Sequence, residues 1–169
     1  MSAETAARHR RDLVIRSWRP ADRDNLLALN AYGLAAAGIP VDDDHYAGAD
    51  LADMDGTYTE AAGGVMLVGE IDQTIVAMGG IRRVDPETCE LLRMRVRPRY
   101  QGRGYGASIL DALEGHARRL GYRRVELITG EEQRPAVDLY TRHGYRVVQR
   151  ETLVGIASVH MVKELCPAP

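Results

Sequence analysis

The sequence predicts an α/β or α+β fold in which helices cover a mixed β-sheet. Three observations support this prediction. The chain has 169 residues and is 45% hydrophobic, which suits one compact domain with its own core. Stretches of alternating apolar residues, typical of strands, occur in both halves of the chain. Apolar residues at three- and four-residue spacing, typical of helices, lie between these stretches.

The first half of the chain is expected to hold three strands, one long helix and an irregular stretch. The strands are expected at 13–17, 65–70 and 74–83. The helix is expected at about 21–34, and residues 35–64 are expected to be irregular or to form short helices. The second and third strands are expected to form a hairpin around Asp72.

The second half is expected to alternate strands with helices and to end in two strands. The strands are expected at 88–96, 123–129, 145–150 and 158–165. One helix follows the first of them, because apolar residues from Ile109 to Leu120 recur at helical spacing and Gly121 suits the position just past a helix end. A second helix begins near Pro135 and ends at Gly144.

Residues 1–11 are polar and are expected to form a flexible tail before a single domain at 12–166. No segment has the apolar length of a membrane span or the pattern of a secretory signal. We therefore expect a cytoplasmic protein that does not bind membranes. The two cysteines, Cys89 and Cys166, are expected to be reduced thiols, and no metal site is expected.

Charge is distributed unevenly along the chain. Ten acidic residues and no Lys or Arg occur from Asp24 to Ile81, whereas 16 basic and 11 acidic residues occur from Arg82 onward. This division favours an anionic cofactor at the basic half and a cationic amine at the acidic half. A solvated acidic surface is an equally good interpretation of the acidic half. Candidate pocket residues within that half are His45, Tyr46 and Tyr58.

The strand at 88–96 carries a series of arginines. Strict alternation places Arg93 and Arg95 with Leu91 on one face. The other face then holds Glu90, Leu92, Met94 and Val96. A basic stripe of this kind is found in nucleic-acid-binding proteins. However, the interleaved residues are aliphatic and the net charge is −2, so we expect no nucleic-acid partner, and solvation at the surface stays an alternative interpretation of Arg93 and Arg95.

The most informative segment joins this strand to the next helix. It reads Val96-Arg97-Pro98-Arg99-Tyr100-Gln101-Gly102-Arg103-Gly104-Tyr105-Gly106 and contains three alternating glycines. Glycine lets the backbone approach a ligand closely, and amides at a helix N-terminus point outward without an intrahelical partner. The segment is therefore predicted to bind a diphosphate.

Other glycine-rich loops fit this segment less well. A triphosphate-binding loop ends in Gly-Lys-Ser/Thr, which is absent here. The dinucleotide fingerprint needs a different glycine spacing, although Glu126 stands where its ribose-binding acid would. An unoccupied tight turn is the least favoured interpretation, because so much glycine would weaken the start of the helix.

Gln101-x-x-Gly104-x-Gly106, after a strand that ends in Val96-x-Pro98, resembles the acetyl-CoA-binding signature of the GNAT family of N-acetyltransferases. The resemblance spans roughly residues 13–165. It implies a mixed, mostly antiparallel central sheet of six to seven strands flanked by about four helices.

A later block at 136–145 supports the resemblance. It is similar to that family's motif of a short helix that carries a tyrosine and ends in glycine plus an aromatic residue. Two departures are mild. Gln133 stands where members often have asparagine, and Tyr145 stands where phenylalanine is common.

The resemblance implies a coenzyme A-dependent N-acetyltransferase that moves an acetyl group from acetyl-CoA to a primary amine of a small molecule or a peptide by direct attack on the thioester. Glu90, eleven residues before Gln101, is the implied general base, and Tyr140 is the implied acid for the departing thiolate. Backbone N–H groups at 94–96 are implied to stabilise the oxyanion. The implied cofactor-binding residues are Met94, Arg95, Val96, Gln101, Gly102, Arg103, Gly104, Tyr105, Gly106, Ala107 and Gln133.

Two other functions stay open at this point. A non-catalytic acyl-CoA-binding or regulatory module would keep the loop without working acid and base groups. A dinucleotide-binding enzyme is the less favoured alternative. The resemblance also implies that two copies can pair as a homodimer, and it does not choose the acceptor amine.

Overall fold

The computed structural model describes residues 12–39 and 48–166. The predicted tail and the pocket candidates His45 and Tyr46 lie outside these residues. Among the residues described, no helix is both long and apolar enough to cross a membrane.

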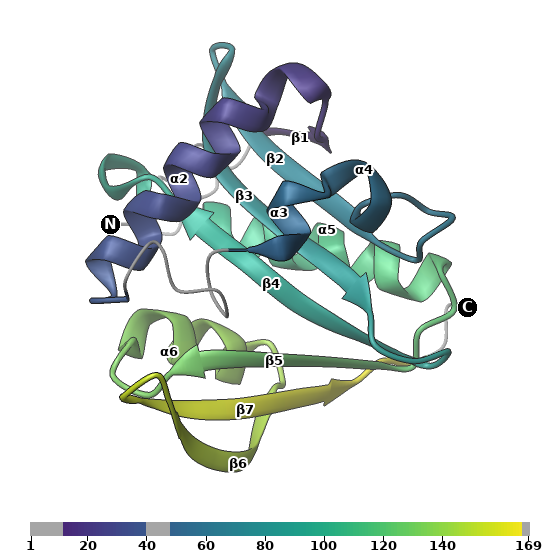
Figure 1. Cartoon of the computed structure of the whole chain (residues 1–169), viewed down its shortest axis with the longest axis vertical. Coiled ribbons are helices and arrows are strands. Elements are labelled where there is room, and N and C mark those ends of the chain that lie inside the picture. The colour runs from purple at the N-terminus through teal and green to yellow at the C-terminus, as the bar shows by residue number, and fades with distance from the viewer. Residues whose placement is uncertain (1–11, 40–47, 167–169) are drawn as a thin grey trace.

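Seven strands form one mixed sheet in the order β1-β2-β3-β4-β5-β7-β6 (Figure 1). Their bounds are Val14–Ser17 (β1), Val65–Ile71 (β2), Thr74–Arg83 (β3), Thr88–Val96 (β4), Arg124–Gly130 (β5), Arg146–Leu153 (β6) and Ile156–Glu164 (β7). Every neighbouring pair is antiparallel except β4 and β5, which are parallel. The predicted mixed, mostly antiparallel sheet of six to seven strands is therefore confirmed.

Five α-helices flank the sheet within the described part of the chain. They are α2 (Arg23–Ala36), α3 (Ala49–Ala52), α4 (Met54–Thr57), α5 (Tyr105–Arg119) and α6 (Arg134–Arg142). Two 3-10 turns, η1 (Pro20–Asp22) and η2 (Pro98–Tyr100), precede α2 and the loop before α5. The stretch expected to be irregular or short-helical thus holds two one-turn helices.

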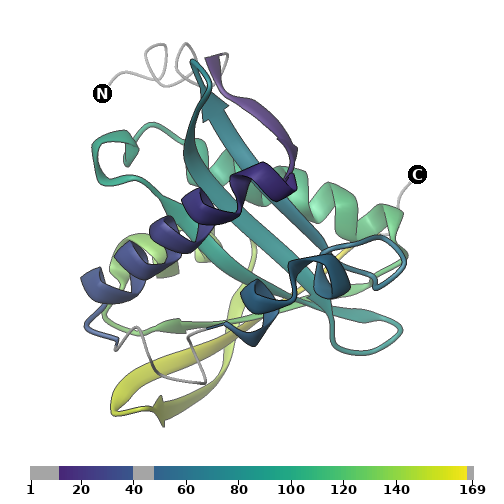
Figure 2. The same cartoon turned by 45° about the horizontal axis from the view of Figure 1, so that its top comes forward.

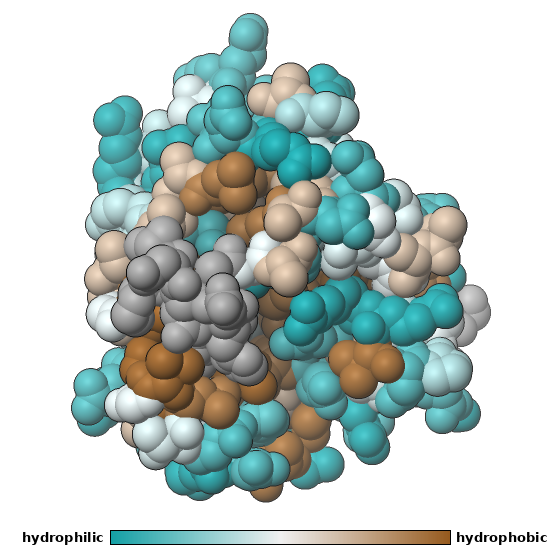
Figure 3. Space-filling model, viewed as in Figure 1, coloured by the Kyte–Doolittle hydropathy of each residue, from teal (hydrophilic) through white to brown (hydrophobic). Residues whose placement is uncertain are grey.

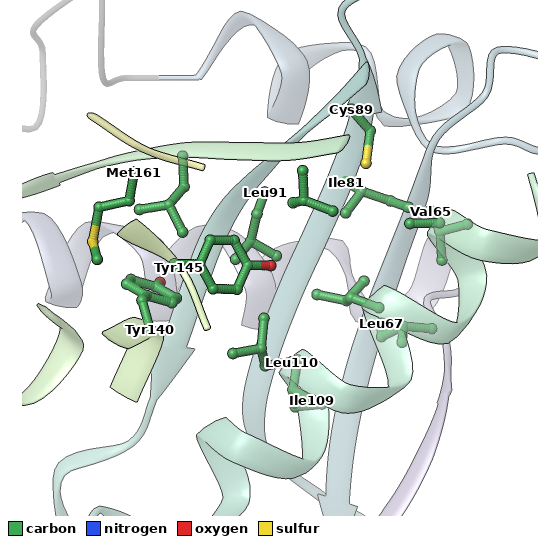
Figure 4. Packing of buried hydrophobic residues seen from close by; sticks show 14 of the residues in the cluster. Val65, Leu67, Ile81, Cys89, Leu91, Ile109, Leu110, Tyr140, Tyr145 and Met161 are labelled. Atoms are coloured by element: carbon green, nitrogen blue, oxygen red, sulfur yellow. The ribbon is translucent and has the colours of Figure 1, made fainter. Parts of the chain in front are cut away.

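The helices divide into two layers with the sheet between them. Figures 1 and 2 show α2, α3 and α4 over one face and α5 over the other. The first layer covers a core cluster made of Leu26, Leu29, Leu51, Met54, Tyr58, Met66, Val68, Ile75 and Met78. On the other face, α5 and α6 bury a larger cluster that includes Leu91, Leu110, Tyr140, Tyr145 and Met161 (Figure 4).

Local sequence explains the main boundaries. Asp72 and Gln73 both have positive φ, at 46° and 63°, as the two central residues of a tight hairpin turn require. α5 begins after Gly104 at φ 86° and is followed by Gly121 at φ 88°. Both glycines adopt a backbone conformation that other L-residues rarely take.

β4 and β5 pair along only a short stretch. Thr88, Cys89 and Glu90 lie opposite Arg124, Val125 and Glu126, after which the strands diverge, as Figure 1 shows. On its other edge, β5 pairs with β7 along its whole length, from Arg124 to Gly130. The sheet therefore opens into a wedge at its centre.

The predicted alternation along β4 is wrong beyond Leu92. Arg95 lies opposite Met78, but Leu92 lies opposite Gly80, so β4 has one extra residue between them. Arg93 takes a φ of 59° within this bulge. As a result, Met94 and Val96 pack with Leu91 against the α5 cluster. Leu92 packs on the opposite face, against the α2 cluster.

Candidate active site

A cavity of about 450 Å³ occupies the wedge between β4 and β5. Its lining comes from both diverging strands, from α3 and α6, and from β7. The lining residues used below are Asp50, Arg82, Glu90, Arg93, Met94, Arg95, Gln133 and Tyr140. Figure 3 shows apolar side chains gathered over the ends of β5 and β7 at the lower left. Ile128 and Ile156, from these strands, also line the cavity.

The glycine-rich loop leads from the end of β4 into α5. Gly102 and Gly104 both have positive φ, at 73° and 86°. The residue that precedes α5, Gly104, makes no side-chain hydrogen bond to the first turn of the helix. The backbone N–H groups of that turn can therefore donate to a ligand. The Gln101 side chain donates a hydrogen bond to the Val96 carbonyl oxygen at 3.0 Å, which fixes the loop next to the strand end.

The same loop presents two arginines. The guanidinium carbons of Arg99 and Arg103 each lie 5.3 Å from the centre of the Tyr100 ring, within the range of cation–π attraction. Uncapped amides at a helix start and neighbouring guanidinium groups together form a site suited to a diphosphate. The loop residues present thus fit the phosphate groups of coenzyme A.

Within the described part of the chain, the edge of β4 that faces β5 has no strand partner beyond Glu90. This edge includes Met94 to Val96, the residues predicted to stabilise an oxyanion. Backbone N–H groups that point from a strand edge into a cavity are free to donate to an oxygen atom bound there.

Glu90 lines the cavity and pairs with a residue directly opposite on β3. Arg82 Nε donates to Glu90 Oε2 at 2.6 Å, and the Glu90 side chain is 22% exposed. A carboxylate that keeps access to the cavity can accept a proton from a bound amine. The ion pair holds the carboxylate in place on the α3 side of the sheet.

Tyr140 enters the cavity from α6 on the opposite side of the wedge. Its ring packs edge-on against Tyr145, with the ring centres 5.7 Å apart (Figure 4). Burial raises the pKa of Tyr140 to about 12, while the positive charge of Arg95 acts in the opposite direction. The phenol is therefore protonated at neutral pH and can act as a proton donor.

Arg93 and Arg95 of β4, for which solvation at the surface was an alternative interpretation, both line the cavity. Arg93 donates from Nη2 to Asp50 Oδ1 at 2.6 Å, and the two side chains are 9% and 2% exposed. Although burial acts to raise the pKa of Asp50, hydrogen bonds from Arg93 and Tyr58 hold it below its ordinary value. This is a buried ion pair at the wall of the cavity.

Arg95 lies against α2, where no carboxylate of residues 12–39 or 48–166 pairs with it. Its Nη1 donates to the Met94 carbonyl oxygen at 2.9 Å, and its Nη2 donates to Asn30 Oδ1 at 3.4 Å. Its Nε is shielded from solvent and has no hydrogen-bond partner among the residues described. Burial, followed by the charge of Arg93, lowers the pKa of Arg95.

The structure brings the predicted site residues to one region. Glu90, Met94, Arg95, Gln133 and Tyr140 line the cavity. Val96 and the loop from Gln101 to Ala107 do not line it; the Gln101 hydrogen bond joins the loop to Val96, two residues after Met94. Of the acidic-half candidates that the structure describes, Tyr58 does not line the cavity; it is buried and donates a hydrogen bond to Asp50.

Sequence reasoning missed two charged residues of the cavity wall, Asp50 and Arg82, which form ion pairs with residues of β4. Asp50 belongs to the acidic run but is 43 positions from Arg93, so no spacing pattern connects them. Arg82 could have been found, because it and Glu90 flank a predicted turn between adjacent antiparallel strands, where facing residues form pairs.

The family model of the GNAT acetyltransferases matches residues 34–145. Among curated proteins, the chain is 27% identical over 128 residues to N-acetyltransferase 8 of Rattus norvegicus, which covers 71% of this chain and 58% of the relative. It is 26% identical over 127 residues to N-acetyltransferase family 8 member 2 of the same organism, covering 69% and 56%. The chain thus spans less than two thirds of the length of these relatives.

Solved acetyltransferase structures share the fold. One from Streptococcus agalactiae superposes with a TM-score of 0.78 at 19% identity and covers 91% of this chain and 99% of the other. The structure of yncA from Salmonella typhimurium with acetyl-CoA superposes with a TM-score of 0.74 at 20% identity, covering 93% and 96%. The family match covers more than half of the sequence, and the fold agrees with it. This chain belongs to the GNAT family of acetyltransferases.

Proposed function

We propose that this chain is an N-acetyltransferase that transfers an acetyl group from acetyl-CoA to a primary amine of a small molecule or a peptide. The observation that carries the proposal is the wedge between β4 and β5. A carboxylate, a protonated phenol and an unpaired strand edge meet there, next to the glycine-rich loop. Family membership favours coenzyme A over a dinucleotide as the ligand of that loop.

Each group has a task in amine acylation. Acetyl-CoA supplies the acetyl group in activated form, as a thioester. The Glu90 carboxylate accepts a proton from the amine, which is mostly protonated in water at neutral pH. The N–H groups of the β4 edge stabilise negative charge on the carbonyl oxygen. The Tyr140 hydroxyl gives a proton to the departing thiolate.

The proposal is tested by measuring thiol release from acetyl-CoA in the presence of a panel of amines. Titration calorimetry with coenzyme A is run on the same preparation. We expect heat of binding and amine-dependent thiol release. Binding without turnover on any amine would support a non-catalytic acyl-CoA-binding module. Absence of binding by folded protein would reject both functions.

Replacing Glu90 with glutamine is expected to lower kcat/KM about 10- to 100-fold, because the amide cannot accept the proton and only water remains to do so. The matched control is Glu126→Gln, since Glu126 lies opposite Glu90 in register on β5 but does not line the cavity. Steady-state rates of both variants make the comparison. Equal rates in the two variants would assign the base role to another group.

Replacing Gly104 with aspartate is expected to weaken coenzyme A binding about 100-fold. A side chain there is strained at φ 86° and sets a negative charge beside the predicted diphosphate site. Gly121→Asp is the control, because Gly121 has a φ of 88° at the other end of α5, with open space around it. Calorimetry that gives the same affinity for both variants would contradict the predicted cradle.

A further inference from the structure

Among the described side chains that line the cavity, positive charges outnumber negative charges. The lining includes five charged residues, and four of them form two ion pairs, Arg82 with Glu90 and Arg93 with Asp50. Arg95 is the fifth. Among the described residues it has only neutral hydrogen-bond acceptors, so the described part of the cavity wall carries one positive charge more than the negative charges beside it.

The structure also makes room for this guanidinium. A Cβ atom built on Gly33 of α2 would lie 2.2 Å from Arg95 Nε and 2.3 Å from Arg95 Cδ. Any residue larger than glycine would therefore push the arginine out of its place. Glycine within a helix is unfavourable relative to alanine. Gly33 therefore makes α2 less stable, but it leaves the space that the Arg95 side chain fills.

A buried cation without an anion is energetically unfavourable unless a ligand supplies the missing charge. Among the described residues, the Nε of Arg95 has no hydrogen-bond partner, and it lies against Gly33, shielded from solvent. Guanidinium groups bind carboxylates with particular strength, because their planar fork matches the two oxygen atoms. A carboxylate that binds Arg95 from the cavity would supply the missing negative charge.

The phosphates of the cofactor do not account for Arg95. Its side chain lies on the α2 face of the sheet, against Gly33 and Asn30. The glycine-rich loop leads into α5, which covers the other face (Figures 1 and 2), and has Arg99 and Arg103 of its own. Arg95 lines the same cavity as Glu90 and Tyr140, and it does so from the side of α2, away from the loop. This position suits contact with the acceptor rather than with the phosphates.

We propose that Arg95 binds a carboxylate of the acceptor, so that the substrate is a small amine that carries an acid group close to the amine, as an amino acid does. This inference rests on the proposed acetyl transfer. With its carboxylate on Arg95, such a molecule presents its amine inside the wedge, between Glu90 and Tyr140. A polyamine or another purely cationic amine would be repelled by the same charge.

Matched sets of amines test the proposal. Each set contains an amino acid, its amide and the amine that lacks the acid group, such as phenylalanine, phenylalaninamide and 2-phenylethylamine. Thiol release is measured at saturating acetyl-CoA. Because the amines of a set differ in pKa, each rate is recorded as a function of pH, and kcat/KM is calculated from the concentration of the neutral amine. We expect kcat/KM to be at least about tenfold higher for the amino acid in each set, through a lower KM.

Variants assign the preference to Arg95. In Arg95→Gln the ratio within each set is expected to fall close to one, whereas Arg95→Lys is expected to keep part of it because the charge remains. Gly33→Ala, which leaves every cavity-lining residue in the sequence, is expected to reduce the ratio by displacing the guanidinium. Arg124→Gln removes an exposed arginine that pairs with Glu164 on the surface, and it is expected to leave the ratio unchanged.

Circular dichroism and thermal unfolding show whether each variant is folded, and the wild-type comparison within each set does not depend on any variant. Equal rates within the sets, or faster rates for purely cationic amines, would overturn the role of Arg95 and leave the acetyltransferase standing. No thiol release from any amine, despite coenzyme A binding, would overturn the acetyltransferase and the carboxylate preference with it.

Discussion

Replacing Tyr140 with phenylalanine is expected to lower kcat by about 100-fold to 10,000-fold and to leave coenzyme A affinity within a few-fold of the wild type. The hydroxyl is the group that would protonate the departing thiolate, and such proton transfer contributes rate factors of this size. Burial raises the pKa of Tyr140 to about 12, so the proton is present throughout the neutral range. Single-turnover rates and calorimetry separate the two quantities.

Tyr145→Phe is the matched control for this variant. The two rings pack edge to face, but the Tyr145 hydroxyl is buried without a hydrogen-bond partner among the described residues, and Tyr145 is not among the residues that line the cavity. Its removal is expected to leave turnover within a few-fold, because no bound reactant reaches that hydroxyl. If both variants kept the wild-type rate, Tyr140 would be a packing residue.

Replacing Asp50 with asparagine is expected to lower the free energy of unfolding by about 3–5 kcal/mol at neutral pH, because it removes the negative charge of the buried ion pair with Arg93. The side chains are 2% and 9% exposed. The expected loss is much larger than for an exposed pair. Denaturant-induced unfolding at pH 7 measures it.

The stability of the wild type and that of the Asp50→Asn variant are also expected to differ in their dependence on pH. Because the pKa of Asp50 is lower in the folded protein than its ordinary value, its stabilising effect is complete above about pH 4. The effect is lost as the pH falls through the lower, folded-state pKa. The asparagine variant lacks this part of the acid dependence.

Asp55→Asn is the control for the buried pair. Asp55 is 75% exposed and lies 3.4 Å from Arg23, so its replacement is expected to change the free energy of unfolding by no more than about 1 kcal/mol. If the Asp50 variant were as stable as this control, the contact between Asp50 and Arg93 would not anchor the bulge of β4.

Much of the fold follows from local sequence signals. The alternation at 65–83 and the helical spacing from Ile109 to Leu120 gave strands and a helix within a few residues of those observed, since each pattern matches the period of its element. Glycines with positive φ punctuate the chain at Gly104, Gly121 and Gly144, where helix ends were expected. The glycine-rich loop was the clearest signal because its function depends on backbone geometry.

The arrangement inside the cavity did not follow from such signals. An extra residue in a strand leaves no trace in the local composition, so the bulge at Arg93 and the resulting exchange of faces were not foreseen. Arg93 is buried because it pairs with Asp50, which belongs to a helix far away in the sequence. Arg95 is buried because Gly33 leaves space for it, and the sequence of α2 alone gives no reason for a glycine at that position. Long-range complementarity of this kind is visible only once the chain is folded.

The two faces of the sheet differ where β4 diverges from β5. The apolar cluster under α5 and α6 draws residues from both halves of the sheet, including Leu91 of β4 and Leu127 of β5. The cluster under α2 has its buried members on segments that precede β4, and Leu92 of β4 packs against it. Among the described residues, hydrophobic packing therefore joins the two halves of the sheet on the side of α5 and not on the side of α2. Arg95 lies on the side of α2, so an acceptor that enters from this side would meet its charge first, and the proposed preference for a carboxylate would then act during entry as well as during catalysis.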